Sequence, residues 1–240
     1  YFAFQIYGDF SGYSDIALGV SKLFGLDLLR NFNYPYFSRD IAEFWRRWHI
    51  SLSSWFRDYL YIPLGGSKGG LWMKIRNTFI IFVVSGFWHG ANWTYIIWGF
   101  INAVYFLPLL LSNSNRNNMD SIVLKWNVDS VKVLFSILTT FLLTCVAWVF
   151  FRARTITDAF LYLRRIFTNK DFAFQYLDNE RYNYELLLMI GLFVLVEWNN
   201  RTKVEPISGK GSILKMALAI TAIIAFGTYS DYKEFIYFQF

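Results

Sequence analysis

Cysteine and histidine are scarce in this sequence, which has one cysteine, Cys145, and two histidines among 240 residues. A single cysteine cannot form a disulfide framework or a cysteine-based metal site. A zinc site built on His49 and His89 would have to be completed by carboxylates. The sequence therefore predicts no metal ion and no tightly bound cofactor.

Charged side chains are also sparse. They make up 17% of the residues, against 55% hydrophobic and 22% aromatic, whereas soluble domains carry about 25% charged residues. The composition therefore predicts a membrane protein embedded in a lipid bilayer. The net charge of +6 fits basic loops at the membrane ends. No basic face stands apart from the hydrophobic segments, so a nucleic-acid partner is excluded.

The longest stretch without Asp, Glu, Lys or Arg covers the 39 residues from Asn77 to Asn115. A membrane helix needs about 20 apolar residues, so this stretch predicts two spans or one broken span. It contains a single histidine, His89, between Gly86 and Gly90. A polar ring in such a place usually faces a cavity or a pathway. His89 is therefore the leading candidate for chemistry.

The rest of the chain predicts further helices. We expect apolar helices over Phe2–Leu29, Val133–Phe151, Leu186–Trp198 and Ser212–Tyr229, and an interfacial helix over Asp158–Phe167. Asp40 followed by Glu43 is typical of a helix start. The expected helix, Ile41–Ile62, carries one aromatic side and one polar side, as in interfacial or re-entrant helices. The predicted fold is an all-α, polytopic integral membrane helical bundle with broken or re-entrant helices.

Three sequence blocks together resemble a known family. They are Gln5–Asp15 (QIYGDFSGYSD), Glu43–Gly66 (EFWRRWHISLSSWFRDYLYIPLGG) and Gly86–Thr94 (GFWHGANWT). In this order they resemble the membrane-bound O-acyltransferases, in the bacterial branch of alginate O-acetyltransferases and teichoic-acid D-alanyl transfer proteins. The terminal Phe235–Phe240 (FIYFQF) is similar to the end of such proteins.

The resemblance implies a multi-helix membrane protein around a central tunnel, of which residues 1–240 would be the C-terminal portion, without the family's N-terminal helices. It aligns the family's near-invariant histidine with His89 and a second motif histidine with His49. In this reading both histidines are catalytic. An imidazole whose ordinary pKa is near 6.5 suits a general base that removes a hydroxyl proton at neutral pH.

Four other residues are candidates for supporting or donor-binding roles. Arg57 and Asp58 could bind donor phosphates or line the tunnel mouth, or could be a solvated pair. Asn92 could polarise a carbonyl, fix the imidazole tautomer or cap a broken helix. Trp88 is expected to form a packing wall. His49 could equally be a structural histidine within an aromatic stripe.

The expected function is transfer of an acyl group, taken to be acetyl, from a cytoplasmic thioester to an exported polysaccharide or a partner protein. The donor would be acetyl-CoA or an acyl carrier, and a periplasmic or extracytoplasmic acyltransferase would be the partner. The location would be the bacterial cytoplasmic (inner) membrane, with several spans. Two alternatives stay open: D-alanyl transfer from a carrier protein toward teichoic acid, and a non-enzymatic membrane transporter or scaffold.

Overall fold

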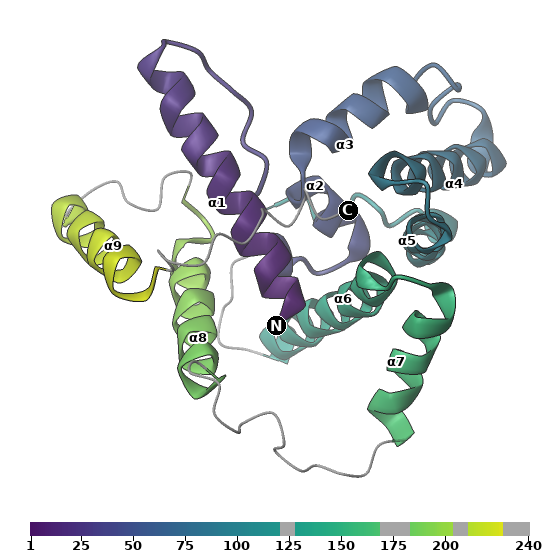
Figure 1. Cartoon of the computed structure of the whole chain (residues 1–240). Helices are drawn as coiled ribbons and strands as arrows, with labels where there is room; N and C mark the ends of the chain where they lie inside the picture. The colour runs from purple at the N-terminus through teal and green to yellow at the C-terminus, as the bar shows by residue number, and fades with distance from the viewer. Residues whose placement is uncertain (121–127, 169–182, 204–210, 228–240) are drawn as a thin grey trace.

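The computed structural model describes residues 1–120, 128–168, 183–203 and 211–227, and every regular element within these ranges is helical (Figure 1). The expected all-α fold is therefore confirmed for the described part of the chain. The terminal block Phe235–Phe240 and the expected end of the last helix at Tyr229 lie outside it.

The first helix, α1 (Phe2–Leu23), precedes the short 3-10 helix η1 (Pro35–Phe37). Between them the chain passes along the break between α2 (Ile41–Arg47) and α3 (Ile50–Phe56). Asp40 caps α2 by accepting a hydrogen bond from the Glu43 backbone N–H at 2.7 Å. The helix start predicted at Asp40 and Glu43 is confirmed.

The prediction of one continuous helix over Ile41–Ile62 is wrong. Trp48 is extended and His49 adopts the left-handed conformation (φ 45°, ψ 57°), so α2 ends and α3 begins in a new direction. The loop residue Asn31 accepts hydrogen bonds from donors in the first residues of α3. Its carbonyl oxygen accepts from the Ile50 N–H at 3.0 Å, and its side-chain oxygen accepts from the Ser51 hydroxyl at 2.6 Å. These bonds to the exposed helix start compensate for a backbone conformation that costs an L-residue about 1–2 kcal/mol.

The segment after α3 continues through a π-helical turn, η2 (Arg57–Tyr61), into the glycine-containing loop before α4 (Gly70–His89). A tight turn at Gly90–Asn92 connects α4 to α5 (Trp93–Leu111). The charge-free run thus forms two helices rather than one broken helix. Among the described helices, α5 and residues Asp129–Arg152 of α6 are long and apolar enough to cross a membrane.

Helices α4 and α5 are in contact at the level of their backbones. A Cβ on Gly86 would overlap the Tyr95 carbonyl oxygen, and a Cβ on Gly99 would overlap the Phe82 carbonyl oxygen. Small residues allow membrane helices to approach this closely. The contact fixes the rotation of α4 about its own axis, with Gly86 facing α5.

Four more helices follow: α6 (Val128–Arg152), α7 (Ile156–Thr168), α8 (Asn183–Asn200) and α9 (Ser212–Phe226). They agree with the predicted ranges to within a few residues where these are described. Glu197, which an apolar span has to accommodate, accepts a hydrogen bond from the Tyr7 hydroxyl at 2.6 Å. That bond connects α8 to α1.

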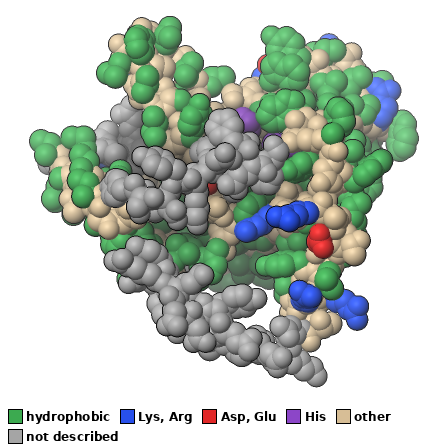
Figure 2. All heavy atoms as spheres, in the orientation of Figure 1, with side chains coloured by type: hydrophobic (Ala, Val, Ile, Leu, Met, Phe, Trp, Pro, Cys, Tyr) green, Lys and Arg blue, Asp and Glu red, His purple; other side chains and the backbone are tan. Residues whose placement is uncertain are grey.

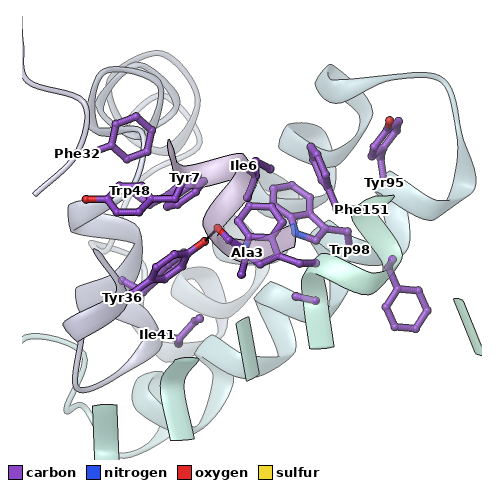
Figure 3. Close-up of a cluster of buried hydrophobic side chains, with 14 of the residues drawn as sticks. Ala3, Ile6, Tyr7, Phe32, Tyr36, Ile41, Trp48, Tyr95, Trp98 and Phe151 are labelled. Carbon is purple, nitrogen blue, oxygen red and sulfur yellow. Dashed lines mark hydrogen bonds between the residues drawn. The ribbon is translucent and has the colours of Figure 1, made fainter. Parts of the chain in front are cut away.

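The core is mainly aromatic. Tyr7, Tyr36 and Trp48 meet with ring centroids 5.2–5.9 Å apart, and Trp98, Trp148 and Phe151 form a second set at 5.2–5.9 Å (Figure 3). Trp48 and Trp148 connect the two sets at 5.2 Å. Edge-to-face and offset rings add about 0.5–1.5 kcal/mol per pair beyond burial, so this cluster holds α1, α2, α5 and α6 together.

Substitution of Gly99 by alanine should destabilise the protein. Because the new methyl group would overlap the Phe82 carbonyl oxygen, we expect a cost of about 1–3 kcal/mol, as for other overpacked sites. Thermal unfolding of the full-length protein in detergent would measure this. Gly191→Ala in α8 is the matched control, because a Cβ there meets nothing within 4 Å. Equal melting temperatures for the two variants would contradict the contact.

Candidate active site

A cavity of about 150 Å³ lies where the break between α2 and α3 faces α4, α5 and α6. Both histidines line it. The other lining residues are aromatic or aliphatic, apart from two serines: Trp45, Trp48, Leu52, Ser53, Phe56, Ile81, Phe82, Ser85, Trp98, Trp148 and Phe151. The structure therefore brings His49 and His89, 40 positions apart in sequence, to one apolar cavity.

His89 is the last residue of α4. Its ring meets Trp98 and Phe151 edge to face, with centroids 5.2 and 5.0 Å apart. The following Gly90 leaves space for the Tyr95 ring, which a Cβ there would approach to 2.8 Å. Aromatic rings thus fix the orientation of the imidazole, and neither of its nitrogens forms a hydrogen bond to another described residue. Both nitrogens remain available to a ligand.

His49 reaches the same cavity because of the helix break. As the left-handed residue before α3, it turns away from the direction of α2, and its ring meets Phe10 of α1 edge to face at 4.6 Å. Within the described part of the chain its imidazole also has no hydrogen-bond partner. A non-glycine residue held in this conformation is costly and is often found at functional sites. A histidine side chain, coloured purple, is partly visible at the surface in Figure 2.

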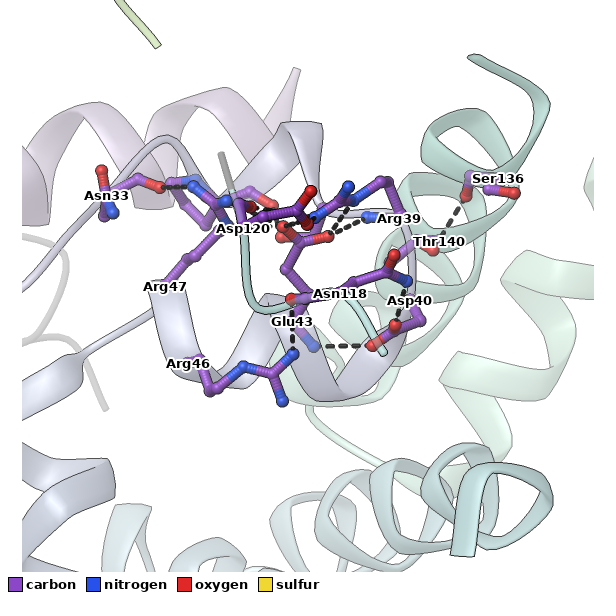
Figure 4. A network of polar contacts seen from close by, with 12 residues as sticks. Asn33, Arg39, Asp40, Glu43, Arg46, Arg47, Asn118, Asp120, Ser136 and Thr140 are labelled. Carbon is purple, nitrogen blue, oxygen red and sulfur yellow. Dashed lines mark hydrogen bonds and ion pairs between the residues drawn. The ribbon is translucent and has the colours of Figure 1, made fainter. Parts of the chain in front are cut away.

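A buried carboxylate holds α2 in place beneath the break. Glu43 is 1% exposed. Its oxygens accept hydrogen bonds from the side chains of Arg39 (3.0 and 3.1 Å) and Arg47 (2.7 and 3.1 Å). Arg46 donates to the Asn118 carbonyl at 3.0 Å, as Figure 4 shows, and to the Asn115 carbonyl at 2.9 Å. The network attaches the loop after α5 to the helix that leads to His49.

The four remaining candidates lie outside the cavity lining. Arg57 and Asp58 are exposed and pair with each other at 2.7 and 3.0 Å, and the hydrogen bonds from Arg57 keep the pKa of Asp58 below its ordinary value. Trp88 is 55% exposed and meets the His89 ring by its edge at 4.9 Å.

Asn92 caps a helix. Its side-chain oxygen accepts from the Thr94 N–H at 3.1 Å, and its amide donates to the Arg154 carbonyl at 3.1 Å. It therefore joins the α4–α5 turn to the α6–α7 turn. Neither of these hydrogen bonds involves the His89 imidazole.

Sequence reasoning missed Ser85 and the cavity walls from α5 and α6. Ser85 lies four residues before His89 on the same helix, and residues at this spacing share a face. That signal was present in the sequence. Trp98, Trp148 and Phe151 could not be recognised as walls, because their positions depend on how separate helices pack.

The sequence profile of the membrane-bound O-acyltransferase family matches residues 2–150. The chain belongs to this family. It is 43% identical over 164 residues to "Probable alginate O-acetylase AlgI" of Pseudomonas aeruginosa, a match that covers 68% of this chain and 29% of the relative. It is 42% identical to the peptidoglycan O-acetyltransferase of Helicobacter pylori, with the same shares covered.

A teichoic acid D-alanyltransferase of Streptococcus thermophilus is 43% identical over 113 residues, covering 43% of this chain and 26% of the relative. The chain spans between about a quarter and about half of the length of its curated relatives. The family match confirms the resemblance carried by the three sequence blocks, and with the apolar helices it identifies a membrane protein.

Glu43→Gln should destabilise α2, the helix that leads to His49. Removing one partner of a buried ion pair costs about 3–5 kcal/mol, because it leaves a buried charge uncompensated. Here Arg47 loses its carboxylate partner, and Arg39 keeps only the exposed Asp120. Chemical or thermal unfolding in detergent would measure the change.

The control is Asp120→Asn. Asp120 also pairs with Arg39, but its side chain is 76% exposed, so we expect at most about 1 kcal/mol. Equal losses in the two variants would show that the buried carboxylate has no special role.

Proposed function

We propose that this chain forms part of a membrane enzyme that transfers a short acyl group, acetyl, from a thioester to a hydroxyl of an exported polysaccharide or a partner protein. The observation that carries the proposal is the apolar cavity shared by His49 and His89, whose ring nitrogens have no partner among the described residues. In this proposal His89 is the general base, and His49 orients the donor or relays the proton.

Three findings support this assignment. An imidazole with free nitrogens can accept the hydroxyl proton as the oxygen attacks the acyl carbon. The family match and the relatives named as O-acetylases and O-acetyltransferases favour acyl transfer. The cavity of about 150 Å³ is lined mainly by apolar side chains, which suits an acyl group.

Several further parts belong to the same proposal. The donor is acetyl-CoA or an acyl carrier thioester on the cytoplasmic side. The acyl group crosses a central tunnel, lined in part by broken or re-entrant helices, in the bacterial cytoplasmic (inner) membrane, which the full protein spans several times. An extracytoplasmic acyltransferase is the partner. D-alanyl transfer toward teichoic acid is the second candidate, supported by the similarity to a D-alanyltransferase.

His89→Ala in the full-length parent protein should abolish acyl transfer, because no other group in the described part of the cavity except His49 can take the proton. Acetyl esters on cell-surface polysaccharide would be measured in cells with equal membrane levels of wild-type and variant protein. We expect acetyl esters to be lost in His89→Ala and retained in Phe87→Ala. Phe87 lies two positions before His89 on α4, and its side chain is 62% exposed.

Other results would change the assignment. Normal acetylation in the His89→Ala cells would remove His89 as the base. Loss of D-alanyl esters in place of acetyl esters would establish the second candidate. A wild-type strain that adds neither group would favour a transporter or scaffold.

A further inference from the structure

Two buried helical hydroxyls have no hydrogen-bond partner among the described residues, Ser85 and Thr94, and of these only Ser85 lines the cavity, whereas protein atoms enclose the Thr94 oxygen. Buried helical hydroxyls commonly donate to a backbone carbonyl one turn earlier. Thr78, Thr140 and Thr144 do so here, at 2.8–2.9 Å. Ser85 is 8% exposed, yet its hydroxyl forms no hydrogen bond to any other described residue. Its oxygen is accessible at the cavity wall, so a water molecule or a ligand in the cavity can supply the missing hydrogen bond.

The packing of α4 against α5 explains why the Ser85 hydroxyl faces the cavity. Gly86 has to face α5, because any Cβ there would overlap the Tyr95 carbonyl oxygen. With α4 fixed in this rotation, Ser85 and His89, one turn apart, both line the cavity. The second serine in the wall, Ser53, already has a hydrogen-bond partner, since its hydroxyl donates to the Trp48 carbonyl at 3.3 Å.

Other unpartnered donors in the wall are less suitable. The indole N–H groups of Trp45 and Trp148 lack partners, but protein atoms enclose both nitrogens. They cannot reach a ligand without a rearrangement. The Ser85 oxygen is not enclosed in this way. Among the described wall residues, Ser85 is therefore the hydroxyl donor that an entering ligand can use.

We infer that Ser85 donates a hydrogen bond to the carbonyl oxygen of the acyl group while that group is transferred beside His89. The inference rests on the proposed function and adds a catalytic residue to it. A preorganised donor in a water-poor cavity stabilises the negative charge that develops on this oxygen.

The step balances as follows. The acceptor hydroxyl oxygen bonds to the acyl carbon, its proton passes to His89, and the C=O π electrons move onto the carbonyl oxygen, which Ser85 then stabilises. When the C=O bond re-forms, the carbon–sulfur bond breaks and the thiolate takes the proton back from His89. Ser85 itself forms no covalent bond. A serine nucleophile would need a base within about 2.6–3.2 Å, and no hydrogen bond joins Ser85 to His89.

The test uses the full-length parent protein in cells, with radiolabelled acetate supplied briefly so that the initial rate of acetyl-ester formation on polysaccharide can be measured. Ser85→Ala should lower this rate by about 100- to 1,000-fold, as expected for loss of one oxyanion donor. Ser85→Thr keeps the hydroxyl and should retain most of the rate. The melting temperature of Ser85→Ala should not fall, because the substitution breaks no hydrogen bond within the described structure.

Thr78→Ala is the matched control. It removes a buried hydroxyl from the same helix, outside the cavity lining, together with its hydrogen bond to the Lys74 carbonyl, and it should leave the rate unchanged. A structural role for Ser85 would show the opposite pattern, with reduced stability in Ser85→Ala.

Three results would overturn the inference: a wild-type rate in Ser85→Ala, equal loss in Ser85→Ala and Ser85→Thr, or an acetyl group found covalently on Ser85 by mass spectrometry. His89→Ala, measured in parallel, separates this inference from the proposed function. If His89→Ala is inactive and Ser85→Ala is active, only the role of Ser85 fails. If the wild type forms no acyl esters, both fail.

Discussion

The backbone contact between α4 and α5 determines the orientation on which the site depends. Gly86 and Gly99 each lie against a carbonyl oxygen of the facing helix, so neither helix can rotate without a clash. A helix with Ser85, Gly86 and His89 in this order presents the glycine to α5 and the two polar side chains to the cavity. Without the glycines the helices would lie further apart, and the rotation of α4 would be set only by deformable side chains.

The other half of the cavity depends on a different kind of constraint. Helix α2 ends before His49 because the loop at Asn31 supplies the hydrogen bonds that the start of α3 needs. Glu43, between Arg39 and Arg47, fixes α2 itself. Thus the hydrogen-bonded charges around Glu43, which lie outside the cavity, position the aromatic side chains at the end of α2 that line it. Buried charges are costly unless they are fully paired, so this network supports only one arrangement of the break.

The sequence predicted what depends on local pattern and composition. The helical fold, the start of α2 at Asp40 and the place of His89 at a cavity followed from apolar runs, a capping residue and one histidine in a charge-free segment. The break at Trp48 and His49 could not be predicted, because neither residue is a glycine or proline and the bonds that stabilise it come from Asn31. The family resemblance singled out His49 and His89, but it did not predict that they share one cavity, which depends on the helix break and on the packing of separate helices.

Arg57 and Asp58 show the limit of reading single residues as ligands. They form an ion pair with each other at the surface. Asn92 likewise forms hydrogen bonds to two backbone groups. Polar groups with protein partners have little to gain from a ligand. Among the described residues, His49, His89 and Ser85 differ, because they face an apolar cavity and have no such partners in the protein. A ligand that enters the cavity can supply the missing hydrogen bonds. The polar atoms that the fold leaves unpaired around this cavity are therefore a stronger guide to the chemistry than the charges it exposes.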